Sequence, residues 1–225
     1  MRKKSRKQQK NDRRRIVPIT AKTPNQKEYI RDIVENDVIF CTGPSGSGKS
    51  YIAAGIAANH IYRNEVDQII VTRPLVCAGQ DIGSLPGELD EKIKPYLLPM
   101  EENLKHFLGR DYYGKLFNDG RIRYEPLEVM RGATFHDAYM ILDEAQNCTL
   151  AQIKMFITRM GENSKVLING DIRQTDIKNF SGLLECVDKL EGIEGVGVSR
   201  LYYEDIQRNG IIGRVLEALE EDYYD

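Results

Sequence analysis

The chain is poor in the features that mark membrane proteins and secreted proteins. It has no tryptophan, and its apolar runs extend over about five to eight residues, whereas a transmembrane helix needs roughly 20. We therefore expect no membrane-spanning segment. The positive charges at the N-terminus have no apolar segment behind them, so we expect no secretory signal.

The few cysteines and histidines are scattered along the sequence. The cysteines, Cys41, Cys77, Cys148 and Cys186, form no C-x-x-C pair, and there are only three histidines. A disulfide framework or a metal cluster is therefore not expected, and we interpret the cysteines as reduced thiols of a cytoplasmic protein. His136 lies directly before an apolar run and is interpreted as structural rather than catalytic.

The net charge of −2 hides a strong asymmetry between the N-terminus and the rest of the chain. Residues 1–15 contain nine Lys or Arg and one Asp, a charge of +8, which leaves −10 for residues 16–225. A block of like charges without apolar residues cannot build a core, so we expect a basic disordered arm. Two interpretations of the arm stay open: it neutralises nucleic-acid phosphates, or it is a solubilising tail that can contact the acidic surface.

A glycine-rich loop is the most informative feature of the sequence. Residues 43–50 read Gly-Pro-Ser-Gly-Ser-Gly-Lys-Ser, which matches G-x-x-x-x-G-K-[ST], between a predicted strand at 37–41 and an Ala-rich helix at 51–58. The glycines let backbone N–H groups turn toward phosphate oxygens, and the helix N-terminus adds its positive dipole end. Lys49 is expected on the β- and γ-phosphates and Ser50 on Mg²⁺. The predicted nucleotide-binding residues are Gly43, Pro44, Ser45, Gly46, Ser47, Gly48, Lys49, Ser50 and Tyr51; a chance glycine-rich turn is the alternative.

Two adjacent carboxylates follow a second predicted strand. This strand, predicted at residues 136–142, is followed directly by Asp143 and Glu144. On a parallel sheet these residues lie at the carboxyl edge, beside the phosphate loop. Asp143 is expected to hold Mg²⁺ and Glu144 to activate the attacking water. An acidic pair that caps a helix is the alternative.

Two later polar residues extend the candidate catalytic set. A strand predicted at 165–169 is separated from the preceding one by room for a single helix, so the two strands are expected to be neighbours. Gln174, beyond the end of this strand, is suited to the γ-phosphate because its amide can donate to a phosphate oxygen and accept from water. Arg208 is a candidate arginine finger, with an ordinary surface arginine as the alternative.

The remaining pattern alternates short apolar runs with helical periods. Residues 75–101, rich in Gly and Pro, predict a structured loop with short helical pieces, followed by a helix to about Leu108 and a polar stretch. Thr23 is expected to cap the first helix. Further strands are predicted at 68–74, 122–124 and 195–201, and helices at 24–35, 150–160, 183–190 and 211–219. This alternation predicts an α/β fold: a single domain over residues 16–225, with a mostly parallel sheet and helices on both faces.

The order of these motifs resembles the PhoH family over about residues 16–220. The Leu-Pro-Gly segment at 85–87 and the Asp-Glu-Ala-Gln-Asn segment at 143–147 are specific to that family among phosphate-loop proteins. The other motifs are Thr23 to Gln26, Thr72 to Pro74, Pro95 to Leu97, Met130 to Gly132, Gly170-Asp171 with Gln174, and Asp205 to Arg208. The resemblance implies a RecA-like phosphate-loop NTPase domain, similar to the first core of superfamily 1 helicases, which uses ATP and Mg²⁺ in the cytoplasm of a bacterium or a phage-infected host.

The resemblance also implies roles for residues outside the phosphate loop. Gln26 would read the adenine base, and Arg73 and Arg131 would contact nucleic acid. The family usually has His-Pro after its late arginine, whereas Asn209-Gly210 follows Arg208 here, a departure that weakens the arginine-finger assignment. Some members carry a nuclease or RNA-binding domain, for which 225 residues are expected to leave no room.

Two functions of different classes follow. The first is an Mg²⁺-dependent ATPase acting on RNA or single-stranded nucleic acid, as a homo-oligomer in which a neighbour completes the site; a hexamer is favoured by the resemblance. The second is an ATP-dependent switch or assembly protein that acts on a protein partner without nucleic acid. The basic arm favours the first and the acidic body the second. A small-molecule kinase is less expected, because Glu144 and Gln174 point to water as the nucleophile.

Overall fold

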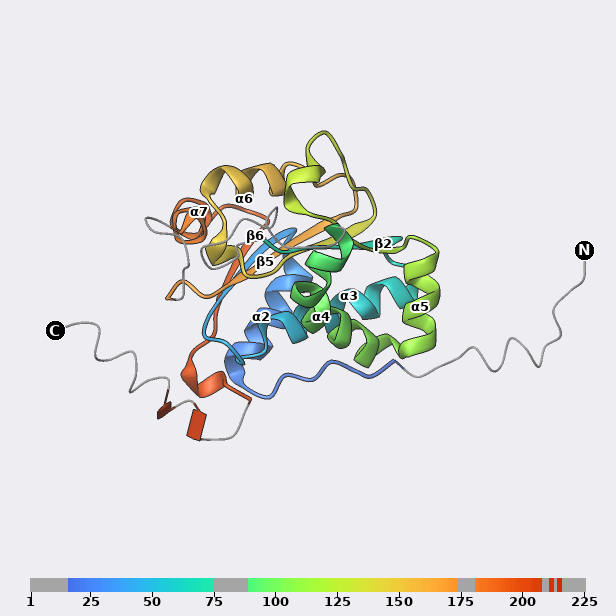
Figure 1. The fold of residues 1–225 in the computed structure, drawn as a ribbon. Helices are drawn as coiled ribbons and strands as arrows, with labels where there is room; N and C mark the ends of the chain where they lie inside the picture. The colour runs from blue at the N-terminus through green and yellow to red at the C-terminus, as the bar shows by residue number, and fades with distance from the viewer. Residues whose placement is uncertain (1–15, 75–88, 174–180, 208–210, 213, 216–225) are drawn as a thin grey trace, which may run out of the picture.

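A single parallel sheet organises the molecule. The computed structural model describes residues 16–74, 89–173, 181–207, 211–212 and 214–215 (Figure 1). Within these residues the sheet has six strands in the order β3-β2-β4-β5-β1-β6, and every pairing is parallel. The strands are β1 (Val38–Thr42), β2 (Gln68–Thr72), β3 (Ile122–Tyr124), β4 (Ala138–Leu142), β5 (Lys165–Gly170) and β6 (Val196–Arg200).

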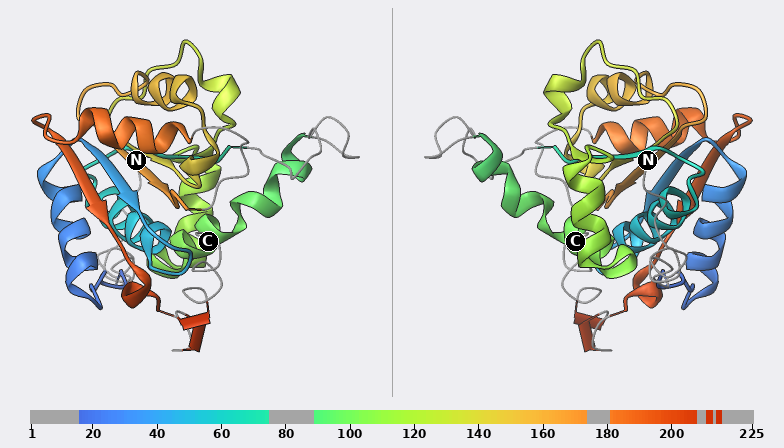
Figure 2. Two further views of the ribbon diagram at one scale, coloured as in Figure 1. Left: turned by 90° about the vertical axis from the view of Figure 1, so that its left-hand side faces the viewer. Right: turned by 90° about the vertical axis from the view of Figure 1, so that its right-hand side faces the viewer.

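Helices cover both faces of the sheet, which confirms the predicted fold class. On one face lie α2 (Pro24–Glu35), α3 (Lys49–Arg63), α4 (Leu89–Leu108) and α5 (Arg110–Asn118), and on the other α6 (Leu150–Ile157) and α7 (Gly182–Leu190) (Figures 1 and 2). Successive strand residues point to opposite faces. Ile39 and Cys41 therefore join one core, and Val38 and Phe40 the other. Burial on both sides explains why the strands read as continuous apolar runs.

The start of α2 follows the sequence prediction. Thr23 has an extended backbone, and its side chain accepts a hydrogen bond from the backbone N–H of Gln26, while Pro24 occupies the first turn. Such a cap satisfies a backbone donor that the first helical turn leaves without a partner. The helix packs beside β6, where the Ser199 hydroxyl donates to Asp32 Oδ2 at 2.6 Å.

The prediction of a loop was wrong for residues 89–101, whereas the helix predicted to end at about Leu108 is confirmed. Instead of a loop with short helical pieces, the chain forms the 20-residue α4, although this helix contains Pro95 and Pro99. Each proline removes a backbone donor and disfavours an α-helix interior, which made a loop the natural interpretation. Packing against the core outweighs the local effect of the prolines, since Leu104 and Phe107 near the end of the helix are buried.

The polar stretch expected after residue 108 is also a helix. In α5, Tyr113 and Leu116 lie on one buried face while the remaining positions are mostly polar. The short, strongly polar segment gave little apolar signal for such a helix. Of the helix predicted at 211–219, residues 211–212 and 214–215 are helical and the others lie outside the described part of the chain.

The sheet brings the two main motifs together. As predicted, β4 and β5 are neighbours, and β5 separates β4 from β1. The backbone N–H of Gly43, directly after β1, donates to the carbonyl of Gly170 at the end of β5 at 3.1 Å. The carboxyl edge of a parallel sheet is where ligands bind in such folds. No helix in the described ranges is long and apolar enough to cross a membrane.

Candidate active site

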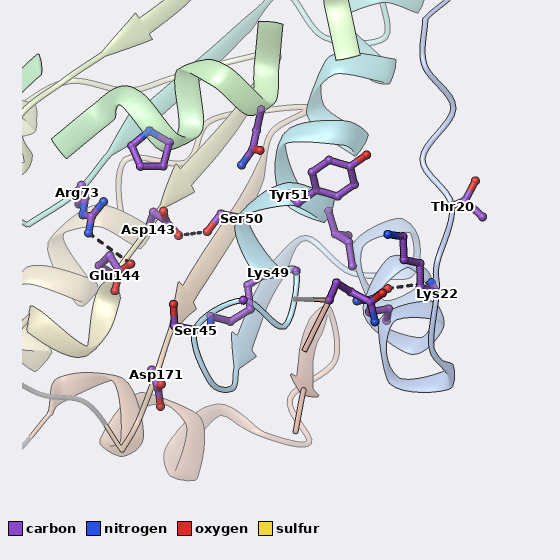
Figure 3. A pocket seen from close by; sticks show the side chains of 17 residues that line it. Thr20, Lys22, Ser45, Lys49, Ser50, Tyr51, Arg73, Asp143, Glu144 and Asp171 are labelled. Atoms are coloured by element: carbon purple, nitrogen blue, oxygen red, sulfur yellow. Dashed lines mark hydrogen bonds and ion pairs between the residues drawn. The ribbon is translucent and has the colours of Figure 1, made fainter. Parts of the chain in front are cut away.

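A pocket of about 570 Å³ at the carboxyl edge of the sheet collects most of the predicted site residues (Figure 3). The predicted residues that line it are Gln26, Ser45, Gly46, Gly48, Lys49, Ser50, Tyr51, Arg73, Asp143 and Glu144. Seven further lining residues are Thr20, Lys22, Ile52, Pro99, Asn103, Asp171 and Gln207. Residues from both halves of the sequence therefore face one cavity.

The phosphate loop has backbone conformations and contacts that require glycine. Gly48 has a φ of 102° where α3 begins, a region that residues with a side chain rarely adopt. A Cβ atom on Gly43 would lie 2.5 Å from the carbonyl oxygen of Leu201, so a side chain there would displace backbone. The Ser47 hydroxyl donates to the Pro44 carbonyl at 2.8 Å and closes the loop internally.

Lys49 points into the loop that precedes it. Its Nζ donates to the carbonyl oxygens of Gly43 at 2.5 Å and Pro44 at 2.9 Å. The ammonium group therefore lies among oxygen acceptors at the N-terminus of α3, the end of a helix that attracts anions. Phosphate oxygens are acceptors of the same kind and can replace the two carbonyls.

Ser50 and Asp143 meet across the pocket. The Ser50 hydroxyl donates to Asp143 Oδ1 at 2.7 Å (Figure 3). Asp143 is buried, and burial is the main reason that its pKa is raised, with the neighbouring charge of Glu144 next. A cation at this point would offset the free-energy cost of burying the ionised carboxylate.

The two oxygen donors fit Mg²⁺, which proteins hold through one or two carboxylates together with substrate phosphates and water. Ser50 and Asp143 would be its protein ligands. In the described part of the chain no three His, Cys, Asp or Glu side chains cluster as a metal site. With only two protein ligands, a bound Mg²⁺ would take its remaining ligands from the phosphates and from water.

Glu144 is held on both of its carboxylate oxygens. Arg73 Nη2 lies 3.3 Å from Oε1, and Gln146 Nε2 donates to Oε2 at 2.6 Å. Its backbone is in the left-handed region with a φ of 58°, so the chain turns sharply at the end of β4. The side chain remains 38% exposed and lines the pocket.

The amide of Gln26 supports the phosphate loop. Its Nε2 donates to the Ser47 carbonyl at 2.9 Å, and its Oε1 accepts the backbone N–H of Lys22 at 2.8 Å. The same Nε2 lies 3.0 Å from the position that a Cβ on Gly48 would take. Each end of the amide keeps one further hydrogen-bonding position, since the NH2 group has two donors and the oxygen two lone pairs, and Gln26 lines the pocket.

Gly43, Pro44 and Ser47 belong to the phosphate loop without lining the pocket, and three other predicted residues lie apart from it or outside the described ranges. Arg131 is exposed after the short 3-10 helix η2 (Leu127–Met130) and does not line the pocket. Gln174 and Arg208 lie outside the described residues. His136 Nδ1 accepts the backbone N–H of Glu162 at 3.0 Å, which fits the structural interpretation of this histidine.

The segment before Arg208 is anchored beside the phosphate loop. Asp205 is fully buried; it accepts hydrogen bonds from the Thr23 hydroxyl and, at 3.0 Å, from Asn25 Nδ2. Two residues later, the backbone N–H of Gln207 donates to the Gly46 carbonyl at 3.1 Å. The sequence motif signalled Asp205, whereas the place of Gln207 in the pocket depends on this tertiary anchoring and had no local signal.

A comparison with protein-family models decides the family. The model described as "PhoH-like protein" matches residues 18–220. The chain belongs to the PhoH family. The "PhoH-like protein" of Synechocystis sp. is 43% identical over 209 residues, which is 92% of this chain and 64% of that protein. "Protein PhoH" of Escherichia coli is 42% identical over 211 residues, or 92% of this chain and 60% of that protein. The chain thus spans less than two thirds of the length of these PhoH relatives.

A solved structure supports the fold independently of sequence. The large terminase of a thermophilic bacteriophage, solved in complex with ADP, matches with a TM-score of 0.53 over 90% of this chain and 50% of that one. Their identity is only 12%, so the match bears on the fold alone. The domain has the RecA-like phosphate-loop NTPase fold that the PhoH resemblance implied.

Proposed function

We propose that this PhoH-family chain is an Mg²⁺-dependent ATPase that couples ATP hydrolysis to the binding or remodelling of RNA or single-stranded nucleic acid. The proposal depends on one observation: Lys49, Ser50, Asp143 and Glu144 converge on one pocket, with Ser50 and Asp143 in direct contact. The phage terminase of similar fold was solved with ADP, which supports a nucleotide as the ligand.

Different residues of the pocket would bind the phosphates, hold the metal ion and accept the proton. Lys49 would bind the β- and γ-phosphates, while Ser50 and Asp143 would hold Mg²⁺, which neutralises phosphate charge when bound. Glu144 would accept a proton from the attacking water. Its exposed carboxylate in the pocket supports this role.

Residues beyond the pocket centre would add specificity and charge. Gln26 would read adenine with the free donor and acceptor positions of its amide, and Gln174 would orient the attacking water. Arg208 would add positive charge at the transferring phosphoryl group. Arg73 and Arg131 would contact nucleic acid, together with the basic arm.

The proposal includes a homo-oligomer, with a hexamer favoured, in the cytoplasm of a bacterium or a phage-infected host. The argument for an assembly is that a single RecA-like core leaves one side of a nucleotide open, where a neighbour can supply the missing cation. The mass of the particle in solution, with and without nucleotide, tests this part directly.

The experiment for the ATPase separates binding from turnover. Lys49→Ala should weaken nucleotide binding, and Glu144→Gln should retain binding but lose turnover by roughly 10²–10⁴-fold, the usual contribution of a general base. Lys154→Ala and Glu162→Gln, exposed positions that do not line the pocket, are the matched controls. Wild-type turnover in Glu144→Gln would remove Glu144 from the mechanism.

A second function has support in the charge distribution. Residues 16–225 carry a charge of −10, which disfavours broad contact with nucleic acid and favours an ATP-dependent switch or assembly protein acting on a protein partner. Addition of single-stranded RNA separates the two functions. The ATPase rate should rise if nucleic acid is the partner and should not respond under the switch hypothesis.

A further inference from the structure

We propose that Gln146 is a positioning residue that fixes the Glu144 carboxylate and couples it to the end of β5 at Asp171. This inference rests on the proposed ATPase function, in which Glu144 acts on water. Gln146 lies in the short 3-10 helix η3 (Ala145–Asn147), directly after β4, and is only 4% exposed.

The amide of Gln146 contacts two parts of the active site at once. Its Nε2 donates to Glu144 Oε2 at 2.6 Å, and its Oε1 accepts the backbone N–H of Asp171 at 3.0 Å. Asp171 lines the same pocket and follows β5 directly. One planar group therefore ties the candidate base on β4 to the end of the neighbouring strand.

The chemistry of this position requires an amide of this length. A neutral amide donates with its nitrogen and accepts with its oxygen, whereas a carboxylate only accepts and a thioether does neither well. Glutamate at 146 would also place a negative charge against Glu144. Asparagine has the right groups but is one methylene shorter than the present bridge.

Packing makes the bridge stiff on the β5 side. A Cβ atom on Gly170 would lie 2.9 Å from both the backbone nitrogen and Oε1 of Gln146. The end of β5 is thus in close contact with the bridging amide. A shift of residues 170–171 would move the Gln146 side chain and, through it, the carboxylate of Glu144.

The ion pair with Arg73 holds only Oε1 of Glu144, so Gln146 is the contact that fixes the second carboxylate oxygen. The Glu144 side chain is 38% exposed, its backbone leaves β4 in a left-handed turn, and a free glutamate can adopt many rotamers. A misplacement of about 1 Å at a reacting group can cost roughly 10²-fold in rate. The hydrogen bond from Gln146 holds the carboxylate at the edge of the pocket.

The test uses variants that remove one or both halves of the bridge. Gln146→Met keeps the length and loses both hydrogen bonds. Gln146→Glu keeps an acceptor for the Asp171 N–H, loses the donor to Glu144 and places a negative charge beside the Glu144 carboxylate. Both variants should lower kcat by about 10- to 100-fold, while KM for ATP and the affinity for a fluorescent ATP analogue change less than twofold.

A double-mutant cycle distinguishes positioning from a loss of stability. In a Glu144→Gln background, Gln146→Met should change the residual single-turnover rate less than twofold, because the base that it positions is gone. Gln152→Met is the matched control, since Gln152 Oε1 accepts the backbone N–H of Thr149 at 2.9 Å in the cap of α6. This control should lower stability toward urea without changing kcat.

Three results would overturn the positioning role. They are an unchanged kcat in Gln146→Glu, a loss of nucleotide affinity that accounts for the lower rate, or an equal loss of rate in the Glu144→Gln background. Gln146→Glu decides the matter if Gln146→Met does not fold. Wild-type turnover in Glu144→Gln alone would instead contradict the proposed role of the base, which is a separate outcome.

Discussion

Arg73 Nη2 lies 3.3 Å from Glu144 Oε1, so a cation directly after β2 is paired with the carboxylate that we assign to the attacking water. The pair lies at the rim of the pocket, with the two side chains 24% and 38% exposed. A phosphate of a nucleic acid would compete with Glu144 for the same guanidinium. Occupation of Arg73 by nucleic acid would therefore release one oxygen of the Glu144 carboxylate.

Replacement of Arg73 by glutamine tests this link. A partly exposed ion pair contributes about 0.2–1 kcal/mol, so its removal should change the basal ATPase rate by at most about fivefold. The same variant should bind single-stranded RNA more weakly and respond less to it. Steady-state ATPase assays with and without RNA measure both effects.

Arg31→Gln is the control for this experiment. Arg31 forms a comparable exposed pair with Glu35 on α2 and does not line the pocket, so this variant should behave as the wild type. A basal rate at least tenfold lower in Arg73→Gln would contradict the expectation. It would show that Arg73 assists turnover directly.

Asp143 gives a pH-dependent prediction for stability. Burial raises the pKa of Asp143 above its value in the unfolded chain, so the ionised form is disfavoured in the folded state. Protonated Asp143 therefore adds to the free energy of unfolding at low pH. This contribution is lost as the pH rises through the pKa of Asp143 in the folded state. Asp143→Asn, which retains an acceptor for the Ser50 hydroxyl, should stabilise the nucleotide-free protein at pH 8.

Urea denaturation at several pH values, without nucleotide or Mg²⁺, checks this sign. The difference in free energy of unfolding between Asp143→Asn and wild type should be largest at pH 8 and shrink in the acid range. Asp119→Asn, an exposed position at the end of α5, should show little difference at any pH. A variant at Asp143 that is less stable than wild type at every pH would refute the argument.

The strands and motifs of this protein could be predicted because their signals are local. A buried parallel strand is a continuous apolar run, and the residues that follow it must lie at the carboxyl edge of the sheet. For this reason the sequence placed Asp143 beside the phosphate loop and β4 beside β5. The Thr23 cap is equally local, since it depends on groups three residues apart.

Contacts that depend on tertiary packing could not be predicted in this way. Gln146 meets the backbone N–H of Asp171, 25 residues away, only because β4 and β5 pair in one particular register. The amide of Gln26 forms hydrogen bonds with backbone groups, and no residue pattern in the sequence predicts them. The first part of α4 was missed because its prolines are a local signal that long-range packing overrides.

The basic arm gives a prediction about salt dependence. Deletion of residues 1–15 should leave the ATPase rate without nucleic acid unchanged and weaken binding to single-stranded RNA. For every phosphate that the arm neutralises, the deletion should reduce the slope of log K against log salt by about 0.7. Fluorescence anisotropy across a salt series measures affinity and slope together.

A full-length variant separates charge from length. Replacement of the nine basic residues of the arm by serine keeps its length and removes its positive charge. It should behave as the deletion does if phosphate neutralisation is the role of the arm. An unchanged affinity and slope in both variants would favour a solubilising tail.

The last prediction concerns Arg208 and a shared active site. Asp205 is bonded to Asn25 of α2 and Gln207 to Gly46 of the phosphate loop, so the residues directly before Arg208 in sequence lie beside the pocket. An arginine finger should affect the rate of hydrolysis and not the affinity for ATP. Arg208→Ala should therefore bind ATP normally and hydrolyse it about 10³–10⁵-fold more slowly.

Mixing two inactive proteins then decides which chain supplies the arginine. Lys49→Ala lacks the phosphate-binding half of the site and Arg208→Ala lacks the finger. Mixed oligomers should regain activity wherever an intact Lys49 of one chain meets an intact Arg208 of the next. We expect this recovery because each core already supplies its own Lys49, Ser50 and Asp143 and leaves the far side of the phosphates open to a neighbour. If the mixture stays inactive although subunit exchange is demonstrated by labelled chains, Arg208 acts on the loop of its own chain, to which Gln207 is already bonded, or has no catalytic role.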